Sequence, residues 1–365
     1  MALVTVEKEG KELSDIDREL ESLLKKQSAR IKVVGCGGGG GNSVSRMKET
    51  GIKGCEVLAL NTDAQDLLYT NVDYKILIGR ELTGGLGAGS NPKIGEEAAR
   101  ESEQEIRKRL TNSDMVFITC GLGGGTGTGA APVVAEVAKK QGALTIGIVT
   151  LPFTVEGQKR IENANYGLER MESIVDTLIV IPNDKLLELA PELPLHTAFK
   201  VADEILTNSV KGIAELITTS GLVNLDFADV KAVMANGGVS LIGIGESDSS
   251  KDRAVEAVER AINNPLLDVN IKDAKGALVN IIGGPDMSLE EYKIVMETIG
   301  NKIAPDAKII SGAQISPDME KSIKVLLIVT GVHSSQILGS GTGQSKTGSG
   351  KGQLGDELGI DFFEE

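Results

Sequence analysis

Two glycine-rich segments of this chain have the composition and placement of phosphate-binding loops. The first, residues 35–42, follows an apolar run and satisfies the spacing G-x-G-x-x-G at Gly35, Gly37 and Gly40. Glycine permits positive φ and leaves backbone N–H groups open to a phosphate, because it has no Cβ. Taken alone, this spacing also fits a Rossmann dinucleotide site or a simple tight turn.

The second segment, residues 120–129, reads CGLGGGTGTG between a predicted strand and a predicted helix. Its glycines expose N–H groups at a helix N-terminus, which carries roughly half a positive charge, and Thr126 and Thr128 add short donors. No lysine follows, so the segment is not a P-loop. A third stretch, residues 84–92, supplies further N–H groups. Three such loops on one sheet favour a ligand with several phosphates.

Two carboxylates, Asp226 and Asp229, stand three residues apart after a long predicted helix. This spacing places both on one face of a helical turn, either as catalytic groups or, more plainly, as a helix cap and a solvated surface pair. Asp203 lies near the start of the long helix, roughly 25–35 Å away at a rise of about 1.5 Å per residue. If Asp203 contacts a nucleotide, the pair cannot reach the same one.

The elements that must position these residues follow a strand–helix alternation. Apolar strands without a polar alternation are predicted at 31–34, 57–60, 115–119, 144–150 and 177–181. Such strands indicate a parallel sheet covered on both faces, and therefore a Rossmann-like α/β domain.

A long helix at about 197–219 is apolar over a wide arc and is predicted to be largely buried. A second, smaller α/β domain with a mixed sheet follows, with helices at about 251–263 and 289–303 and strands at 239–244, 277–282, 308–310 and 323–330. The predicted divisions are an N-terminal extension with a short helix at 1–30, a nucleotide-binding domain at 31–195, a central helix at 196–220, the second domain at 221–338, a flexible linker at 339–353 and a tail at 354–365.

Composition narrows the possible functions. A net charge of −14 over 365 residues disfavours nucleic acid as a partner. The three cysteines form no C-x-x-C pair, which favours reduced thiols in a cytosolic protein. We find no signal peptide and no apolar run long enough to span a bilayer, so membrane contact is expected only through a partner. His196 and His333 have no pattern of a triad or metal site.

The heptapeptide GGGTGTG at 123–129 matches the signature of the tubulin/FtsZ superfamily without a change. The chain resembles FtsZ, and the sequence of its body and tail is more similar to the archaeal members than to the bacterial ones. Further matching segments are NTD at 61–63, GLGAG at 85–89, IPNDK at 181–185 and NLDFADV at 224–230. The resemblance spans about residues 31–332. It implies the tubulin/FtsZ fold and a GTPase that converts GTP to GDP and phosphate as it forms head-to-tail filaments of the division ring.

The resemblance also implies roles for individual residues. The α- and β-phosphates would be held by Gly38, Gly39, Gly40, Gly41, Asn42, Gly125, Thr126 and Gly127, and the γ-phosphate by Ala88, Gly89, Ser90 and Asn91. Glu156 and Arg160 match ribose and phosphate contacts, Asn183 and Asp203 the guanine-reading positions, and Phe199 the ring that packs on the base. The plainer alternatives are a solvated i,i+4 pair for Glu156 and Arg160 and core packing for Phe199.

By the same resemblance, Asp226 and Asp229, helped by Asn224, orient or polarise a water at the γ-phosphate of the next subunit, so hydrolysis requires assembly. Mg²⁺ is expected to be held by the phosphates and water, with no protein metal site. Two alternatives remain open. One is a Rossmann NAD(P) enzyme, for which Asp63 loosely matches the ribose carboxylate. The other is a paralogue that binds GTP but turns it over poorly.

The linker is rich in Gly, Ser, Thr, Gln and Lys, and about 15 flexible residues reach on the order of 20 Å. In the tail, Leu358, Ile360, Phe362 and Phe363 stand among acidic residues, as in a docking peptide that orders on binding. A merely disordered acidic end is the alternative. FtsZ tails commonly bind membrane-anchoring adaptors, and a SepF-like adaptor is the partner we expect. This tail does not match the usual bacterial motif, which leaves the identity of the partner open. The expected location is the cytoplasm, at the midcell ring on the inner face of the membrane.

Overall fold

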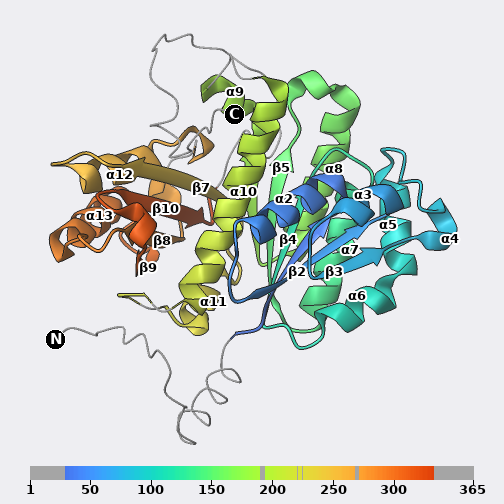
Figure 1. Ribbon diagram of the computed structural model, residues 1–365, viewed down its shortest axis with the longest axis horizontal. Helices are drawn as coiled ribbons and strands as arrows, with labels where there is room; N and C mark the ends of the chain where they lie inside the picture. Colours follow the sequence, from blue (N-terminus) through green and yellow to red (C-terminus); the bar gives the residue numbers. More distant parts are fainter. Residues whose placement is uncertain (1–28, 190–193, 220, 224, 268–270, 333–365) are drawn as a thin grey trace, which may run out of the picture.

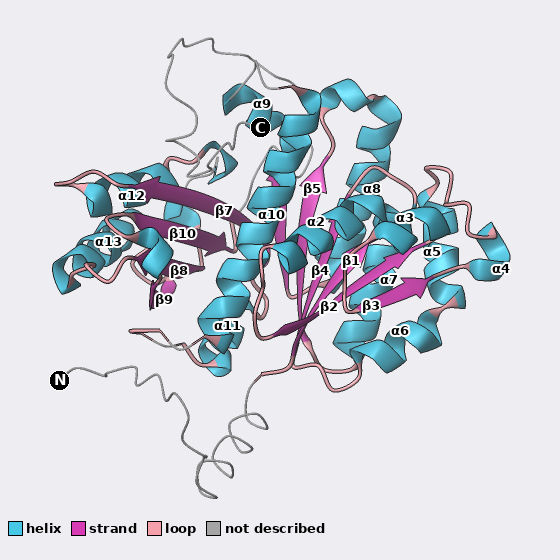
Figure 2. Cartoon of the chain, viewed as in Figure 1, coloured by secondary structure: helices cyan, strands magenta, loops and turns pink. Residues whose placement is uncertain are grey.

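The computed structural model describes residues 29–189, 194–219, 221–223, 225–267 and 271–332. Within these residues, strands form a 10-stranded sheet in the order β3-β2-β1-β4-β5-β6-β7-β10-β8-β9, covered by helices on both faces (Figures 1 and 2). The predicted helix in the N-terminal extension, the linker at 339–353 and the tail at 354–365 lie outside the described residues. The predicted α/β class is confirmed.

The first half of the sheet is entirely parallel. Its strands are β1 (Ile31–Cys36), β2 (Cys55–Asn61), β3 (Tyr74–Leu77), β4 (Met115–Gly121), β5 (Leu144–Leu151) and β6 (Thr177–Pro182). The central strands are buried on both faces, which explains why they read as unbroken apolar runs. The edge strand β3 was not predicted, because Tyr74 and Lys75 are exposed and break the apolar run.

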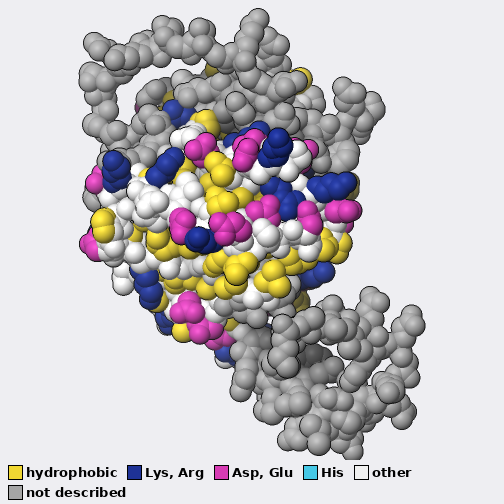
Figure 3. Space-filling view, turned by 90° about the vertical axis from the view of Figure 1, so that its left-hand side faces the viewer, with side chains coloured by type: hydrophobic (Ala, Val, Ile, Leu, Met, Phe, Trp, Pro, Cys, Tyr) yellow, Lys and Arg dark blue, Asp and Glu magenta, His cyan; other side chains and the backbone are white. Residues whose placement is uncertain are grey.

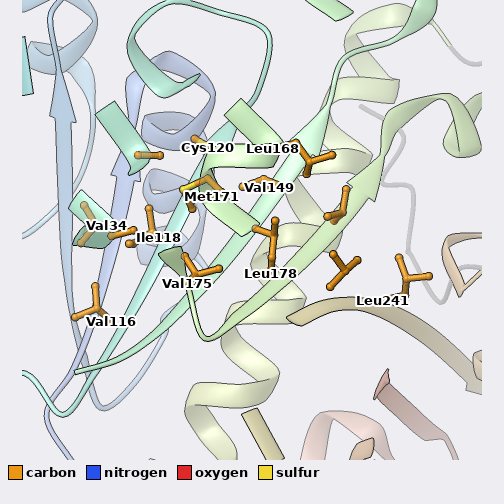
Figure 4. Packing of buried hydrophobic residues seen from close by; sticks show 14 of the residues in the cluster. Val34, Val116, Ile118, Cys120, Val149, Leu168, Met171, Val175, Leu178 and Leu241 are labelled. Carbon is orange, nitrogen blue, oxygen red and sulfur yellow. The ribbon is translucent and has the colours of Figure 1, made fainter. Parts of the chain in front are cut away.

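Two layers of helices cover this half. The helices are α2 (Gly37–Glu49), α3 (Ala64–Tyr69), α4 (Arg80–Thr83), α5 (Pro92–Glu101), α6 (Glu103–Leu110), α7 (Thr126–Lys140), the 3-10 turn η1 (Thr154–Glu156), α8 (Gln158–Ile174) and α9 (Asn183–Leu189). On one face α7 and α8 pack on the sheet, where Ile118 and Cys120 of β4 lie close to Leu168 and Met171 of α8 (Figure 4). On the other face α2 and α3 share a core with Phe117.

The second half of the sheet is mixed, as predicted: β7 pairs antiparallel with β10, β10 antiparallel with β8, and β8 parallel with β9. Its elements are α11 (Phe227–Met234), β7 (Gly238–Ser247), α12 (Arg253–Ile262), η2 (Pro265–Leu267), η3 (Ile271–Asp273), β8 (Gly276–Gly283), α13 (Leu289–Lys302), β9 (Lys308–Ile315), η4 (Pro317–Met319) and β10 (Ile323–Thr330). On the side of the molecule where this half lies, hydrophobic side chains gather in a band between acidic and basic ones (Figure 3).

The long helix α10 (Leu195–Thr218) runs between the two halves and packs on both (Figure 1). Most of its buried apolar residues belong to one cluster with Ile146 of β5 and Leu326 of β10. Asn280 of β8 donates its side-chain N–H to the carbonyl of Gly212 in α10 at 3.1 Å. The halves also meet directly, because β6 and β7 pair in parallel over Thr177↔Gly238, Leu178↔Val239 and Ile179↔Ser240. The two predicted sheets are therefore continuous.

Glycine in β7 sets how closely α12 approaches the sheet. A Cβ at Gly243 would clash with the Ala261 carbonyl of α12, so we expect Gly243→Ala to lower the free energy of unfolding by about 1–3 kcal/mol. Gly300→Ala is the control: it lies on the exposed side of α13 with nothing near its Cβ position. This change should stabilise by about 0.5–1 kcal/mol, because alanine favours a helix. Urea unfolding curves measure both, and equal effects would contradict the packing argument.

Candidate functional site

A cavity of about 400 Å³ opens at the carboxyl ends of β1, β4 and β5, where Cys36, Gly121 and Thr150 lie on its wall. Ligands of open α/β sheets bind at this edge, because the following helices begin there. The predicted residues that the cavity brings together are Gly38, Gly39, Asn42, Gly125, Thr126, Gly127, Glu156, Arg160, Asn183, Phe199 and Asp203. Of the first segment, Gly40 and Gly41 are buried and do not line it.

The first glycine segment is the opening of helix α2 and not a free loop. At Gly40, a Cβ would stand 2.5 Å from the Thr119 carbonyl oxygen of β4, and at Gly35 a Cβ would clash with the Gly40 carbonyl. Only glycine allows the helix to begin this close to the sheet. The N-terminus of α2, with its partial positive charge, is thereby fixed at the cavity wall.

The second glycine segment leads into α7, whose N-terminus meets that of α2. Gly37 has φ +71°, and a Cβ there would stand 2.7 Å from the backbone nitrogen of Gly127. Two helix N-termini thus converge on one cavity, an arrangement that favours an anion with several charges. The Thr126 hydroxyl lies 2.6 Å from that of Thr62. Thr128 was expected to donate to a phosphate, but its fully buried hydroxyl accepts the Gly123 N–H at 2.9 Å and shapes the loop instead.

The third loop borders the second without lining the cavity. A Cβ at Gly125 would stand 2.9 Å from the Ala88 Cβ and 2.8 Å from the Asn91 nitrogen. Asn91 caps α5 by accepting the Lys93 N–H at 3.1 Å. Gly89 and Ser90, between them, have φ values of 56° and 58°. The four predicted residues therefore form one tight turn against the start of α7.

The far wall of the cavity combines a free acceptor, a carboxylate and a ring. Among the described residues, no hydrogen-bond donor reaches the Oδ1 atom of the buried Asn183. Asp203 accepts the Ser43 hydroxyl at 2.7 Å, and burial raises the pKa of its carboxyl above the usual value. Phe199 is 39% exposed and packs edge-on against Phe153, with centroids 5.1 Å apart. These groups fit a flat base that carries N–H donors.

Glu156 and Arg160 form an ion pair one helical turn apart, and both line the cavity. Glu156 also accepts the Phe153 N–H at 2.9 Å. This bond holds the backbone of Phe153, whose ring packs against Phe199. The plainer interpretation, an i,i+4 ion pair, is therefore confirmed. Because both side chains also line the cavity, a ligand bound there would contact them.

Asp226 and Asp229 lie at the start of α11, and both are exposed. The predicted capping role is confirmed for Asp226, whose Oδ1 accepts the Asp229 N–H at 2.8 Å. The preceding loop is fixed to the edge strand β9, because the Leu222 N–H donates to the Ala313 carbonyl at 2.8 Å. Asn224 lies outside the described residues.

The aspartates and the cavity lie at opposite ends of the parallel strands. The last residue of α10, Thr218, packs against Gly54, immediately before β2 begins, and so at the amino ends of the parallel strands. The cavity is at their carboxyl ends. From Asp203 to Thr218 alone, α10 rises about 22 Å. Within one chain the aspartates therefore do not reach the cavity.

Of the two thiols in this region, Cys36 lines the cavity and Cys120 is buried in the core beside it. Burial raises the pKa of Cys36 well above its usual value and that of Cys120 to about 12, so both stay protonated. In the part of the chain that the structure describes, no three His, Cys, Asp or Glu side chains gather as a metal site needs. No helix within the same residues is long and apolar enough to cross a membrane.

Several residues of the site were not predicted from the sequence. Ser43 holds Asp203, Phe153 supports Phe199, and Thr62 pairs with Thr126. The only signal for Thr62 was its place in the NTD segment at 61–63. Ser43 and Phe153 stand beside recognised motifs but carry no pattern of their own.

Comparisons with known proteins agree with this geometry. Residues 30–191 match the model of the Tubulin/FtsZ family, GTPase domain, and residues 238–333 that of the FtsZ family, C-terminal domain. Cell division protein FtsZ 1 of Thermococcus kodakarensis is 63% identical over 88% of this chain and 86% of its own length. The protein of the same name from Methanocaldococcus jannaschii is 59% identical over 88% of each. A solved structure, the empty FtsZ dimer of M. jannaschii, superposes with a TM-score of 0.84 at 55% identity, covering 92% of this chain and 100% of that one.

The fold and the cavity define a GTPase of the tubulin-like class, with two helix N-termini at a phosphate site and a long helix between two α/β halves. Within that class, the chain belongs to the FtsZ family and resembles its archaeal members. The alternative of an NAD(P)-dependent Rossmann enzyme is thereby excluded.

The buried carboxylate of Asp203 predicts a stability that depends on pH. Its folded-state pKa is raised by burial, so its favourable contribution is present below the ordinary value near 3.8 and is lost as the pH rises through the raised value. At pH 7 the ionised carboxylate opposes folding. We therefore expect Asp203→Asn to raise the free energy of unfolding at pH 7, by an amount that shrinks as the pH falls.

Asp114 provides a control of opposite sign, because its hydrogen bonds from Arg30 lower the pKa of its carboxyl. Asp114→Asn should destabilise the protein at pH 7, with the loss fading as the pH falls through the lowered value. Unfolding curves of the nucleotide-free protein between pH 3 and pH 7 measure both variants. The explanation fails if Asp203→Asn destabilises at pH 7.

Proposed function

We propose that this protein is a cytoplasmic FtsZ-type GTPase that polymerises head to tail into the filaments of the cell-division ring and hydrolyses GTP between subunits. The observation that carries the proposal is the position of the cavity and the aspartate pair at opposite ends of the parallel strands. A repeated heterologous contact would set the pair of one subunit against the cavity of the next, and such a contact builds a filament. The names of the relatives and the dimeric M. jannaschii FtsZ support this proposal.

The proposed ligand is GTP, with GDP and phosphate as the products. The α- and β-phosphates lie at the converging N-termini of α2 and α7, and the γ-phosphate extends toward the turn at 88–91. Asn183 and Asp203 read guanine, since the N1–H and 2-amino groups donate to acceptors and adenine has neither donor there. Mg²⁺, held by the phosphates and water, neutralises phosphate charge. Equal affinity for ATP and GTP in a competition assay would remove the guanine assignment.

For hydrolysis, phosphoryl transfer needs a placed water and charge stabilisation more than covalent chemistry. Asp226 accepts the cap hydrogen bond through one oxygen, which orients the other. We assign Asp229 and Asp226 to the attacking water of the neighbouring subunit, with Asn224 at the same contact. This arrangement makes turnover depend on assembly.

Exposed apolar side chains at the two edges support the filament contact. Leu86, in the third glycine loop, is 89% exposed, and Tyr69, at the end of α3, is also exposed. At the opposite edge Leu222, in the loop before the aspartates, is 66% exposed. Burial of such side chains between subunits supplies the apolar contact that a filament needs.

The division of the site between subunits predicts complementation in trans. Asp229→Ala should keep GTP binding and lose turnover by about 100-fold or more, giving longer-lived filaments. Gly127→Ala should weaken binding, because its Cβ would stand 3.0 Å from the Cys36 carbonyl oxygen and 3.1 Å from that of Gly121, so the backbone of the loops must shift. Mixing the two variants should restore part of the phosphate release, because some interfaces then pair an intact cavity with intact aspartates.

The exposed Asp318 on η4 is the matched carboxylate control, and Asp318→Ala should leave turnover unchanged. Phosphate release is followed together with light scattering. A dilute protein shown to be monomeric that hydrolyses GTP as fast as the polymer would rule out the two-subunit site. A wild-type protein that binds GTP but scarcely turns it over would favour the non-catalytic paralogue.

For the tail at 354–365, which lies outside the described residues, we propose docking to a membrane-anchoring, SepF-like adaptor. Many weak contacts along one filament add up through multivalency. Removing residues 354–365 should leave GTPase activity and assembly near normal and abolish co-sedimentation with the adaptor and midcell localisation. A tail of the same composition in scrambled order is the control. If the scrambled tail still binds the adaptor, the tail is merely an acidic end and has no docking sequence.

A further inference from the structure

One buried side chain connects the second and third glycine loops. Asn163, in α8, donates from Nδ2 to the Ser90 carbonyl at 3.1 Å and to the Gly123 carbonyl at 3.2 Å. Its side chain amide has two N–H donors, and each has an acceptor in these loops. Asn163 is 7% exposed and does not line the cavity, so its contacts are with the loops and not with a ligand.

Both accepting residues have unusual backbone conformations. Ser90 has φ 58°, a left-handed value that a residue with a side chain adopts only when its surroundings hold it there. Gly123 has φ 106°, and its own N–H is held by Thr128. The Asn163 amide therefore supplies a contact from outside the loop that holds the carbonyl of Ser90 in place.

The same helix is in direct contact with the phosphate site. A Cβ at Gly123 would stand 3.0 Å from the Arg160 carbonyl, and the Arg160 side chain lines the cavity. The third loop touches the second at Gly125, where Ala88 and Asn91 leave room for glycine only. Displacing Ser90 would thus change the distance between residues 88–91 and the start of α7.

We propose that Asn163 is a positioning residue that sets the spacing of the two loops and so determines how strongly the site prefers a nucleoside triphosphate to a diphosphate. The inference rests on the proposed assignment of residues 88–91 to the γ-phosphate. A diphosphate ends at the second loop and does not need the third loop in place. A triphosphate needs both.

Asn163→Asp tests the proposal with almost no change of shape. It replaces the donating NH₂ by an oxygen that repels both carbonyls, so the third loop loses its anchor. Affinity for a non-hydrolysable GTP analogue should fall about tenfold, while affinity for GDP stays within about twofold. The exposed Asn165, on the same helix, gives the matched control Asn165→Asp, which adds the same charge and should change neither affinity.

Two further variants make every outcome decisive. Asn163→Ala removes the donors without adding charge. If the Asp variant no longer binds GDP, the ratio of the two affinities is measured with the Ala variant instead. If Asn163→Ala weakens GTP analogue and GDP equally and lowers Tm, the residue is only structural and the proposal is overturned. Ala88→Val alters the third loop directly. If it weakens the GTP analogue selectively while the Asn163 variants do not, the role of Asn163 is wrong and the γ-phosphate assignment stands. If no variant separates the two nucleotides, the γ-phosphate assignment falls as well.

Discussion

Where α2 and α7 begin, two backbones approach each other more closely than any side chain allows, and the cavity exists because of that approach. Gly37 and Gly127 meet at the point where both helices start, and Gly40 rests on β4. Each contact brings an N-terminus, with its unpaired N–H groups, to the same edge of the sheet. The chain as a whole carries a net charge of −14, so the attraction for a polyanion has to come from these local dipoles.

The length of α10 then determines which groups lie at the two ends of the parallel strands. Its first turns carry Phe199 and Asp203 into the cavity, and its end leads into the loop that β9 holds in place. Asp203 is retained although burial raises its pKa and its ionised form opposes folding at neutral pH. A buried carboxylate of this kind is typical of a site where recognition of a ligand outweighs stability.

The elements of the fold were predictable because their signals are local. Buried parallel strands such as β4 and β5 are continuous apolar runs, and α10 has a helical period throughout. The four-residue β3, half exposed, has no such signal. For the site, the glycines were recognised, but their sequence could not distinguish those that line the cavity from Gly40, which serves helix packing. Both uses require only the absence of a Cβ.

The contacts that orient the site were out of reach for a different reason. Ser43 and Asp203 are 160 positions apart, and Asn163 and Ser90 are 73 apart. No spacing rule links such pairs, because their proximity depends on how helices pack across the sheet. The double role of Asp226, as helix cap and as a candidate for catalysis, was visible as two alternatives, and both remain compatible with its geometry.

The junction of β6 and β7 gives the sheet an uneven mechanical strength. Every neighbouring pair of strands in the first half is joined by at least four residue pairs, whereas this junction has only three. A force that separated the two halves would therefore act on this short ladder and on α10, whose apolar contacts reach both halves. The union of the two halves thus depends more on side-chain packing against one helix than on backbone hydrogen bonds between strands.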